Sequence, residues 1–368
     1  MKIGITGQNG FIGKHLYNYL SLKEEIELVP FNKDFFNKEI ELENFVKECD
    51  TIIHLAAVNR NPDEQYIYKT NIELVNKIII ACEKTSSTPH VIFSSSTQEE
   101  KDNPYGASKK KGREALESWS LKSGSLTTGM IIPNVFGPYG KPYYNSVVAT
   151  FCHQVAREEK PTVLNDGLLK LIYINELIEE IHKLVLSKKS GKVIIEHKHE
   201  IQVSGLLNAL HSIKEKYYDN GEIPTLETPF NLALFNTFRC YLPASYFPRL
   251  YKKHTDNRGA FVEIIRTNTS GQFSFSTTKP GITRGNHYHT RKAERFSVIQ
   301  GKASIKIRNI NSQEIIEYII DGQSPGYVDM PIWCTHNITN IGSEELITLF
   351  WINEPYNPDN SDTYFLNV

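Results

Sequence analysis

A tyrosine and a lysine four positions apart are the first side chains whose types and spacing could do chemistry. Tyr105 and Lys109 stand at i and i+4, so on a helix they share one face. A neighbouring ammonium favours the phenolate and lowers the tyrosine pKa, which would let Tyr105 donate a proton to a carbonyl near neutral pH. Upstream, a serine-rich run from Ser94 to Thr97 offers a hydroxyl to hold that carbonyl. Alone, such a pair is more often a surface feature, but together with a glycine-rich turn and a His-Leu-Ala-Ala segment it predicts a carbonyl-reducing site.

The glycine-rich turn follows the first predicted strand, residues 2–6, and opens the first predicted helix, residues 11–20. Glycines at such a turn let the backbone approach a pyrophosphate, which the N-terminus of the helix stabilises. The spacing is GxxGxxG and can be purely structural, but its place between a strand and a helix predicts dinucleotide binding. The predicted contacts in this turn are Gly7, Gly10, Phe11, Ile12 and Gly13.

The residues after the second predicted strand, residues 27–31, bear on the choice of nicotinamide cofactor. In NAD enzymes an acidic residue near the end of this strand holds the ribose 2′-hydroxyl. Asn32 and Lys33 stand there instead, and a neutral residue beside a lysine suits a 2′-phosphate. We therefore expect NADPH, with NAD as the alternative because Asp34 follows directly.

Three histidines and a glutamate form the second group of side chains. Alternate residues of a strand face the same side, so His287 and His289 would point together. Glu294 and His336, from neighbouring strands, could complete a set of three nitrogens and one oxygen. Such a set suits Zn, Ni, Fe or Mn, and Zn2+ is the default for a redox-silent site. A lone histidine pair would more often be structural, whereas four candidates at this spacing predict a metal site.

The elements that must position these two groups differ between the halves of the chain. The first half alternates short apolar runs with helical patterns, which indicates an α/β Rossmann-type fold, a doubly wound parallel sheet covered by helices. The last third is rich in short strands separated by Gly, Pro, Asn and Asp, which indicates an all-β barrel or sandwich. A proline-containing stretch at residues 239–253 is the predicted junction, so we expect domains at residues 1–243 and 244–368. Further elements expected in the first half are strands at residues 51–56 and 91–94 and helices at residues 71–83 and 108–120.

The bulk composition limits the partners of the protein. With 368 residues, 40% of them hydrophobic and 23% charged, the chain fits a globular protein of two domains. A net charge of −1 gives no reason to expect nucleic acid or an anionic membrane as a partner. No apolar run reaches the roughly 18 residues that span a bilayer. The five cysteines form no CxxC pair, and we find no signal peptide, so we expect a cytoplasmic protein.

The first two thirds of the chain resemble the extended short-chain dehydrogenase/reductase family that acts on nucleotide sugars. The resemblance rests on the segments TGQNGFIG, HLAA, IFSSS, YGASK and PNVFGP. It implies that Ser96, Tyr105 and Lys109 are the catalytic residues and that Asn134 lies at the substrate pocket. It also implies that the cofactor contacts the HLAA segment and the helix pair, namely Leu55, Ala56, Ala57, Tyr105 and Lys109.

Three departures from that family limit what the resemblance implies. The interval from Ser96 to Tyr105 is short, nine residues, so a trimmed loop is expected at the site. The sequence Ser-Thr-Gln at residues 96–98 replaces the Thr-Asp-Glu run of the sugar 4,6-dehydratases, so dehydration is not expected. An arginine that contacts phosphate in the family is missing, and Lys170 could substitute for it.

The second half resembles the cupin family through the pattern G-x5-H-x-H-x4-E-x6-G followed by a further histidine. This resemblance implies a double-stranded β-helix fold and a metal held by the three histidines and the glutamate named above. Trp333 stands where cupins usually carry glycine.

Residues 256–263 and 281–285 also resemble the deoxysugar 3,5-epimerases of the dTDP-rhamnose pathway. Those enzymes use a histidine at the position of His287 and a lysine at the position of Glu294, without a metal. Because the lysine is absent here and the metal set is present, His287 is either a base or a ligand, and we expect a ligand. Arg284 could hold substrate phosphate, while Tyr356 and Lys302 are conceivable proton carriers but more often structural.

The whole chain resembles the CapF family of capsular-polysaccharide biosynthesis. This resemblance implies that the cupin domain epimerises C3 of a UDP-4-keto-6-deoxy-N-acetylhexosamine. The first domain would then reduce C4 with NADPH to give UDP-2-acetamido-2,6-dideoxy-L-talose. Two alternatives stay open: a 4-epimerase that retains NAD, and a reductase whose cupin only binds sugar or dimerises. The resemblance also implies a homodimer.

Overall fold

The computed structural model describes residues 1–251, 253–256, 259–262, 264–265, 271–354 and 357–368. Contacts divide the chain into two compact units. The first comprises Met1–Thr150 and Leu164–Val203, and the second Phe151–Val163 and Ser204–Val368. The segment at residues 204–243 therefore groups with the β-rich part, whereas the sequence predicts a boundary after residue 243. Tyr356 and parts of the segment at residues 256–263 lie outside the described residues.

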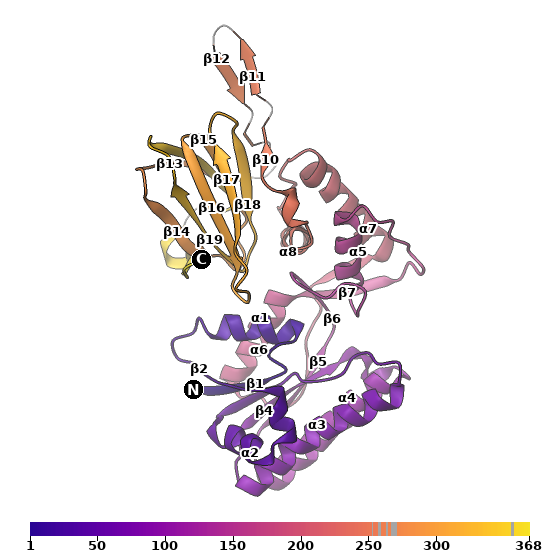
Figure 1. Ribbon diagram of the computed structural model, residues 1–368. Helices are drawn as coiled ribbons and strands as arrows, with labels where there is room; N and C mark the ends of the chain where they lie inside the picture. Colours follow the sequence, from indigo (N-terminus) through magenta and orange to yellow (C-terminus); the bar gives the residue numbers. More distant parts are fainter. Residues whose placement is uncertain (252, 257–258, 263, 266–270, 355–356) are drawn as a thin grey trace. The chain divides into compact units, whose positions relative to one another are not determined.

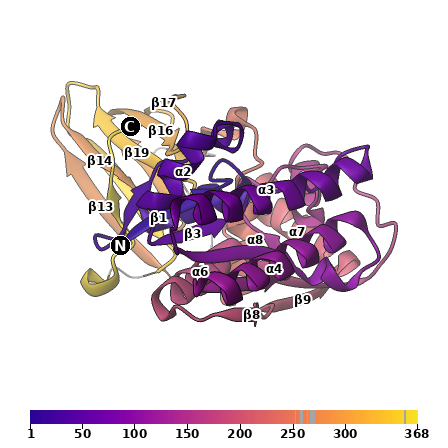
Figure 2. The ribbon, with the colours of Figure 1, turned by 90° about the horizontal axis from the view of Figure 1, so that it is seen from below.

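The first unit is built on a six-stranded parallel sheet of order β2-β1-β3-β4-β5-β8. Helices α1 and α6 lie on one face of this sheet, and α2, α3 and α4 lie on the other (Figure 1). Figure 2 shows α3 and α4 running side by side. The predicted doubly wound Rossmann-type fold is therefore confirmed. The strands are β1 Lys2–Thr6, β2 Glu27–Val29, β3 Thr51–His54, β4 His90–Ser96, β5 Thr127–Ile132 and β8 Gly191–Ile194, and the helices are α1 Phe11–Leu20, α2 Glu39–Glu48, α3 Glu64–Thr85, α4 Pro104–Ser123 and α6 Ile174–Ser187.

The central strands carry continuous apolar runs because both faces of the sheet are covered by helices. Ile52 and Val91 are fully buried on neighbouring strands, and Phe45 and Trp119 from α2 and α4 pack in the same cluster. A three-stranded sheet of β6 Asn134–Phe136, β7 Leu168–Tyr173 and β9 His199–Gln202 extends the unit.

Helix α4 begins four residues earlier than the sequence predicts, and this matters for the site. Asn103 accepts a hydrogen bond from the Gly106 backbone N–H at 2.8 Å, and Pro104 occupies the first turn, where its missing N–H costs nothing. Tyr105 therefore lies in the first turn of the helix, and Lys109 lies one turn later.

The second unit contains two five-stranded sheets, of order β10-β18-β15-β20-β13 and β17-β16-β19-β14-β21, and a hairpin of β11 and β12. Val298, Ile305 and Ile338 from both sheets share one core, so the sheets pack face to face as expected of a cupin. The strands are β10 Arg249–Leu250, β11 Lys253–Asp256, β12 Gly259–Val262, β13 Gln272–Thr278, β14 Thr283–Tyr288, β15 Glu294–Gln300, β16 Lys302–Asn309, β17 Ile316–Asp321, β18 Gly326–Met330, β19 Cys334–Asn340, β20 Leu346–Ile352 and β21 Tyr364–Phe365.

The helical segment at residues 204–243 is joined to the β-strands of the same unit by a buried polar network. The Arg295 guanidinium donates to the Asp329 carboxylate at 2.8 and 3.1 Å, and the Tyr217 hydroxyl donates to the same carboxylate. Arg239 of α8, Pro229–Arg239, donates to the Met330 carbonyl at 2.6 Å. Helices α5 Val147–Ala156 and α7 Val203–Ile213 cross the limits of the units.

None of the five cysteines forms a disulfide, and four are buried, as expected of small side chains that fill a core. Burial raises the pKa of the Cys49 and Cys82 thiols to about 12. Among the described residues, no helix combines the length and the apolarity that crossing a bilayer requires.

Candidate active site and metal centre

The glycine-rich turn brings the end of β1 against the end of β3. Gly7 has φ +77°, and a Cβ on it would lie 2.7 Å from the Ala56 backbone nitrogen. A Cβ on Gly13 would overlap the Gly7 carbonyl oxygen. The predicted cofactor contacts Gly7, Gly13 and Ala56 are therefore packed together, in a turn whose backbone only glycine allows.

Lys109 is buried behind Tyr105. Its ammonium donates to the Ser94 hydroxyl at 3.4 Å and lies 5.7 Å from the centre of the Tyr105 ring. The Ser94 hydroxyl in turn donates to the His54 carbonyl at 3.2 Å. Burial lowers the pKa of Lys109 to about 7, because a charged ammonium is costly in a site that is 2% exposed.

Tyr105 departs from the expected electrostatics. Burial raises its pKa to about 12, and Tyr144 adds to the effect, whereas the sequence predicts a pKa lowered by Lys109. The Lys109 ammonium lies over the face of the Tyr105 ring. Burial lowers the pKa of Lys109, so the lysine carries less positive charge near neutral pH. In this state Tyr105 keeps its proton, as a proton donor must.

Ser96 lies at the end of β4 and caps the short helix η2, Thr97–Glu100, by accepting from the Gln98 backbone N–H at 3.2 Å. A Cβ on Gly106 would overlap the Gln98 carbonyl oxygen, so η2 and the start of α4 are in close contact. The nine-residue interval between Ser96 and Tyr105 is thus filled by η2 and a short turn, in line with the trimmed loop that the sequence predicts.

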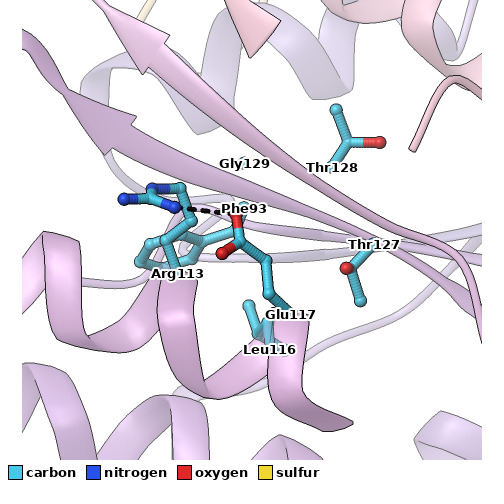
Figure 3. A pocket seen from close by; sticks show the side chains of 7 residues that line it. All are labelled: Phe93, Arg113, Leu116, Glu117, Thr127, Thr128 and Gly129. Carbon is cyan, nitrogen blue, oxygen red and sulfur yellow. Dashed lines mark hydrogen bonds and ion pairs between the residues drawn. The ribbon is translucent and has the colours of Figure 1, made fainter. Parts of the chain in front are cut away.

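An ion pair that the sequence does not reveal fixes η2 to α4. The Arg113 guanidinium donates to both Glu99 carboxylate oxygens, at 2.9 to 3.2 Å, and to Glu117 at 2.7 Å. Ser95 also donates to Glu99. Figure 3 shows Arg113 and Glu117 in a small recess beside Gly129 of β5, where a Cβ would lie 2.5 Å from the Arg113 side chain. This glycine leaves the space that the buried arginine needs.

Two further buried polar residues near the site escape sequence reasoning. Asn71 of α3 donates to the Ser108 hydroxyl at 3.0 Å and to the Val58 carbonyl at 3.0 Å, which ties α3 to α4. The signal in the sequence was that Asn71 is a polar residue on the apolar side of the helix predicted at residues 71–83. His54 shares a hydrogen bond of 2.6 Å with Thr6, and burial lowers its pKa to about 3, so it is a neutral structural residue.

The residues predicted to select the cofactor are exposed beyond β2. The Asn32 side chain accepts from the Asp34 backbone N–H at 3.0 Å, while Lys33 is exposed. Gln8 of the glycine-rich turn donates to the Phe31 carbonyl at 2.7 Å, which holds this loop beside the turn.

The residues predicted to contact substrate lie on strands. Asn134 is exposed on β6, and Lys170 on β7 pairs with Glu200 at 3.9 Å across the strands. In the second unit, Arg284 donates to the Thr278 hydroxyl and to the Thr277 carbonyl, each at 3.1 Å, and remains exposed.

The three histidines and the glutamate of the second unit converge. One ligand atom from each of His287, His289, Glu294 and His336 lies within 4.8 Å of every other. The two strands that carry His287 and His336 pair directly, with these two residues opposite each other. His289 follows the end of β14 rather than lying inside the strand, and Glu294 begins β15. The structure thus brings together all four residues that the sequence predicts.

The donor atoms of this cluster fit a divalent cation. His289 Nε2 lies 2.9 Å and His336 Nε2 lies 3.2 Å from the same Glu294 oxygen. Nevertheless, these three buried atoms have no partner at hydrogen-bonding geometry among the described residues. Buried polar atoms that converge without bonding one another are suited to surround a metal ion.

Two of the protonation states agree with that reading, whereas burial of His289 is outweighed by Glu294 and the Asp362 backbone, which raise its pKa. Burial lowers the pKa of His287 to about 4, and His336 adds to the effect, so its ring is neutral. Burial disfavours the Glu294 carboxylate, but His289 and His336 hold its pKa well below the ordinary value. A neutral imidazole and an ionised carboxylate are the forms that bind metal.

Trp333 is the residue at which the sequence departs from the cupin pattern, and its contacts explain how the turn accommodates it. It has φ +57°, a left-handed conformation that favours glycine, and its buried ring lies 5.9 Å from that of Tyr288. Its backbone N–H donates to the His289 carbonyl at 2.8 Å. Packing and this bond hold a tryptophan where the turn itself would prefer glycine.

Comparison with known proteins covers both units. Residues 3–195 match the NAD dependent epimerase/dehydratase family, and residues 254–364 match the polysaccharide biosynthesis C-terminal domain. A UDP-2-acetamido-2,6-beta-L-arabino-hexul-4-ose reductase of Pseudomonas aeruginosa is 35% identical over 100% of this chain and 99% of its own. The crystal structure of the capsular polysaccharide assembling protein CapF from Staphylococcus aureus is 34% identical, covers 100% of both chains and has a TM-score of 0.63.

A more distant structure supports the fold of the first unit alone. RMD from Pseudomonas aeruginosa, complexed with NADPH, is 20% identical over 58% of this chain and 82% of its own, with a TM-score of 0.52. The full-length matches decide the assignment: the chain belongs to the NAD dependent epimerase/dehydratase family and, over its whole length, to the CapF-like proteins that add a polysaccharide biosynthesis C-terminal domain.

Proposed function

We propose that this protein is a bifunctional UDP-sugar enzyme of capsular polysaccharide synthesis. Its cupin part epimerises C3 of a UDP-4-keto-6-deoxy-N-acetylhexosamine. Its reductase part then reduces C4 with NADPH to give UDP-2-acetamido-2,6-dideoxy-L-talose, on the way to N-acetyl-L-fucosamine. The observation that carries the proposal is the full-length similarity to a UDP-keto-sugar reductase in a chain that also retains a convergent His3Glu cluster.

The order of the two steps follows from chemistry. Removing the proton from C3 requires the neighbouring C4 carbonyl, because the enolate spreads its charge onto that oxygen. A divalent cation such as Zn2+, held by the cluster, would stabilise this charge when bound. Reduction removes the carbonyl, so epimerisation must come first.

In the reductase part, Tyr105 delivers a proton to the C4 oxygen and Ser96 holds that oxygen by a hydrogen bond. Lys109 reaches the same region through Ser94, at 3.4 Å, and supplies the positive charge behind Tyr105. When bound, NADPH supplies the hydride. Asn134 and Arg284, each exposed on its strand, are the proposed contacts to the nucleotide sugar.

The preference for NADPH over NADH rests on the loop after β2. Lys33 is exposed and Asn32 is neutral, which suits a 2′-phosphate. Changing Lys33 to Glu should raise the KM for NADPH while leaving that for NADH unchanged. An equal effect on both cofactors would contradict this assignment.

The proposal is tested by proton NMR of the product formed in D2O from a UDP-4-keto sugar, with and without NADPH. Tyr105→Phe should abolish reduction and leave deuterium incorporation at C3. His336→Ala should lose bound metal and the incorporation. Reduction that survives in the first variant, or metal content that is unchanged in the second, contradicts the residue assignment.

Two alternative functions are separated by the same assay. A 4-epimerase that retains NAD would keep its cofactor through purification and consume no NADPH. A cupin that only binds sugar or dimerises would give no deuterium at C3. For this purpose the proposed reductase is residues 1–243 and the proposed cupin residues 244–368.

We also propose a homodimer, acting in the cytoplasm. Phe273 and Phe275 are 59% and 69% exposed on β13, at the edge of its sheet, which is an apolar surface that a second copy could cover. Changing both to Ser should shift the mass measured by light scattering from dimer to monomer. The absence of disulfides among the five cysteines fits a reducing compartment.

A further inference from the structure

The C-terminal segment, residues 361–366, is bound to the strand and the loop that carry the proposed metal ligands. Strand β21 pairs with β14, with Phe365 opposite His287 and Tyr364 opposite Tyr288. The Leu366 backbone N–H donates to the Asn286 carbonyl at 2.9 Å. The last residues of the chain thus form one edge of the sheet that holds the cluster.

One bond from this segment reaches a ligand directly. His289 Nδ1 lies 2.5 Å from the backbone carbonyl oxygen of Asp362, and both residues are buried. A carbonyl oxygen can only accept, so Nδ1 of His289 must carry a proton. Nε2, the atom that faces Glu294 at 2.9 Å, is then the nitrogen left to bind a cation.

The three histidines differ in how they are oriented. His336 Nδ1 lies 3.1 Å from the Cys334 carbonyl, so its ring takes its orientation from a residue two positions earlier. His289 instead takes it from Asp362, 73 positions away. The orientation of the His289 ring therefore depends on the C-terminal segment.

The Asp362 side chain fixes this arrangement from the other direction. Its fully buried carboxylate accepts from three consecutive backbone N–H groups, those of Thr290 at 3.1 Å, Arg291 at 3.0 Å and Lys292 at 3.2 Å. It also accepts from the Thr290 hydroxyl at 2.6 Å. These donors form the loop between His289 and Glu294, so one residue shapes the loop with its carboxylate and orients the ring with its carbonyl.

We propose that residues 361–366 complete the metal site and that Asp362 is a positioning residue for His289. The inference rests on the proposed metal function, because a fixed Nδ1–H tautomer has its use where Nε2 binds a cation. The loss of a hydrogen-bond partner of a metal ligand commonly lowers the metal affinity by roughly 10- to 100-fold. The cluster thus has a fifth essential residue, supplied by the end of the chain.

The first test measures Zn2+ affinity by competition with a chelator, in the full-length protein and its variants. Asp362→Asn keeps the size of the side chain but places an amide among backbone donors, so we expect affinity to fall roughly 10- to 100-fold. A chain that ends after Asn360 should lose at least as much. Asp359→Asn, at an exposed carboxylate just before this segment, is the matched control and should leave affinity unchanged.

The second test reads the tautomer itself, by long-range 1H–15N NMR of the imidazoles in the metal-free protein. His289 should carry its proton on Nδ1 in the wild type and should lose this preference in the shortened chain, while His336 keeps it. If Nδ1 of His289 carries no proton in the wild type, or if both variants bind Zn2+ as tightly as the wild type, the inference is overturned. If the wild type binds no metal, the proposed metal function fails. The proton position on His289 is then the measurement that tests whether Asp362 orients this ring. Should the shortened chain not fold, Asp362→Asn and the tautomer measurement decide.

Discussion

Replacing Lys109 by Met should make the first unit more stable while it abolishes reduction. Methionine matches the length of the buried lysine stem and carries no charge. Burial lowers the pKa of Lys109 from 10.5 to about 7, so the fold disfavours the ammonium. The group is 2% exposed, so solvent does not screen this effect. The substitution removes the cost of burying the charge along with the charge itself.

The magnitude follows from linkage. Between the folded pKa of about 7 and the unfolded value of 10.5, the unfolded chain binds more protons, so wild-type stability rises with pH in this range. The cost of burying the ammonium corresponds to about 4 kcal/mol at pH 7 and about 2 kcal/mol at pH 9, and it disappears above the unfolded pKa. Lys109→Met should gain up to these amounts, less at pH 9 than at pH 7.

Hydrogen exchange of amides in β4 and α4 reports the opening of the first unit and measures this difference at both pH values. Lys110→Met, an exposed neighbour on the same helix, is the control and should change stability by less than about 0.5 kcal/mol. Reduction by Lys109→Met should fall at least roughly 100-fold, since proton transfer typically contributes that much. A variant that is less stable at pH 7, or equally stabilised at both pH values, would refute the reasoning.

Three other perturbations test the site and its supports. Gly13→Ala places a Cβ against the Gly7 carbonyl, so NADPH affinity should fall at least roughly tenfold in a fluorescence titration. An unchanged affinity would mean that the turn does not contact the cofactor. Arg113→Met leaves the Glu99 carboxylate, 4% exposed, without its partner. The free energy of unfolding of the first unit, measured by hydrogen exchange, should fall by about 3 to 5 kcal/mol, and adding Glu99→Gln should restore part of it. Asp329→Ala leaves the buried guanidinium of Arg295 without its carboxylate partner. The free energy of unfolding of the second unit in urea should fall by about 3 to 5 kcal/mol, whereas a fall below about 1 kcal/mol would mean that water reaches the arginine.

Local patterns in the sequence were enough to predict much of the fold. Strand β1 and helix α1 have the predicted limits because the glycine-rich turn between them is adjacent in sequence to both. The parallel sheet followed from alternating apolar runs, and the cluster of three histidines and a glutamate from residue types at close spacing, although His289 lies just beyond β14. In each case the chemistry lies within a few consecutive residues, or on strands that pair by a simple register.

Residue types alone also indicated the pair of Tyr105 and Lys109, since i and i+4 positions meet on any helix. Their pKa values depend on burial, which has no local pattern. The sequence therefore predicted a lowered pKa for Tyr105, and the packing around it reverses the direction.

Only the tertiary structure decided which distant residues support the two sites. Arg113 meets Glu99 because Gly129 on a third element leaves room for it, and Asp362 meets His289 across 73 positions. The helical segment after Val203 joins the β-rich unit because the Tyr217 hydroxyl reaches a buried carboxylate on β18. Such contacts depend on the path of the whole chain, so the sequence by itself determined the fold class and predicted the candidate reacting groups, and three-dimensional packing decided what holds those groups in place.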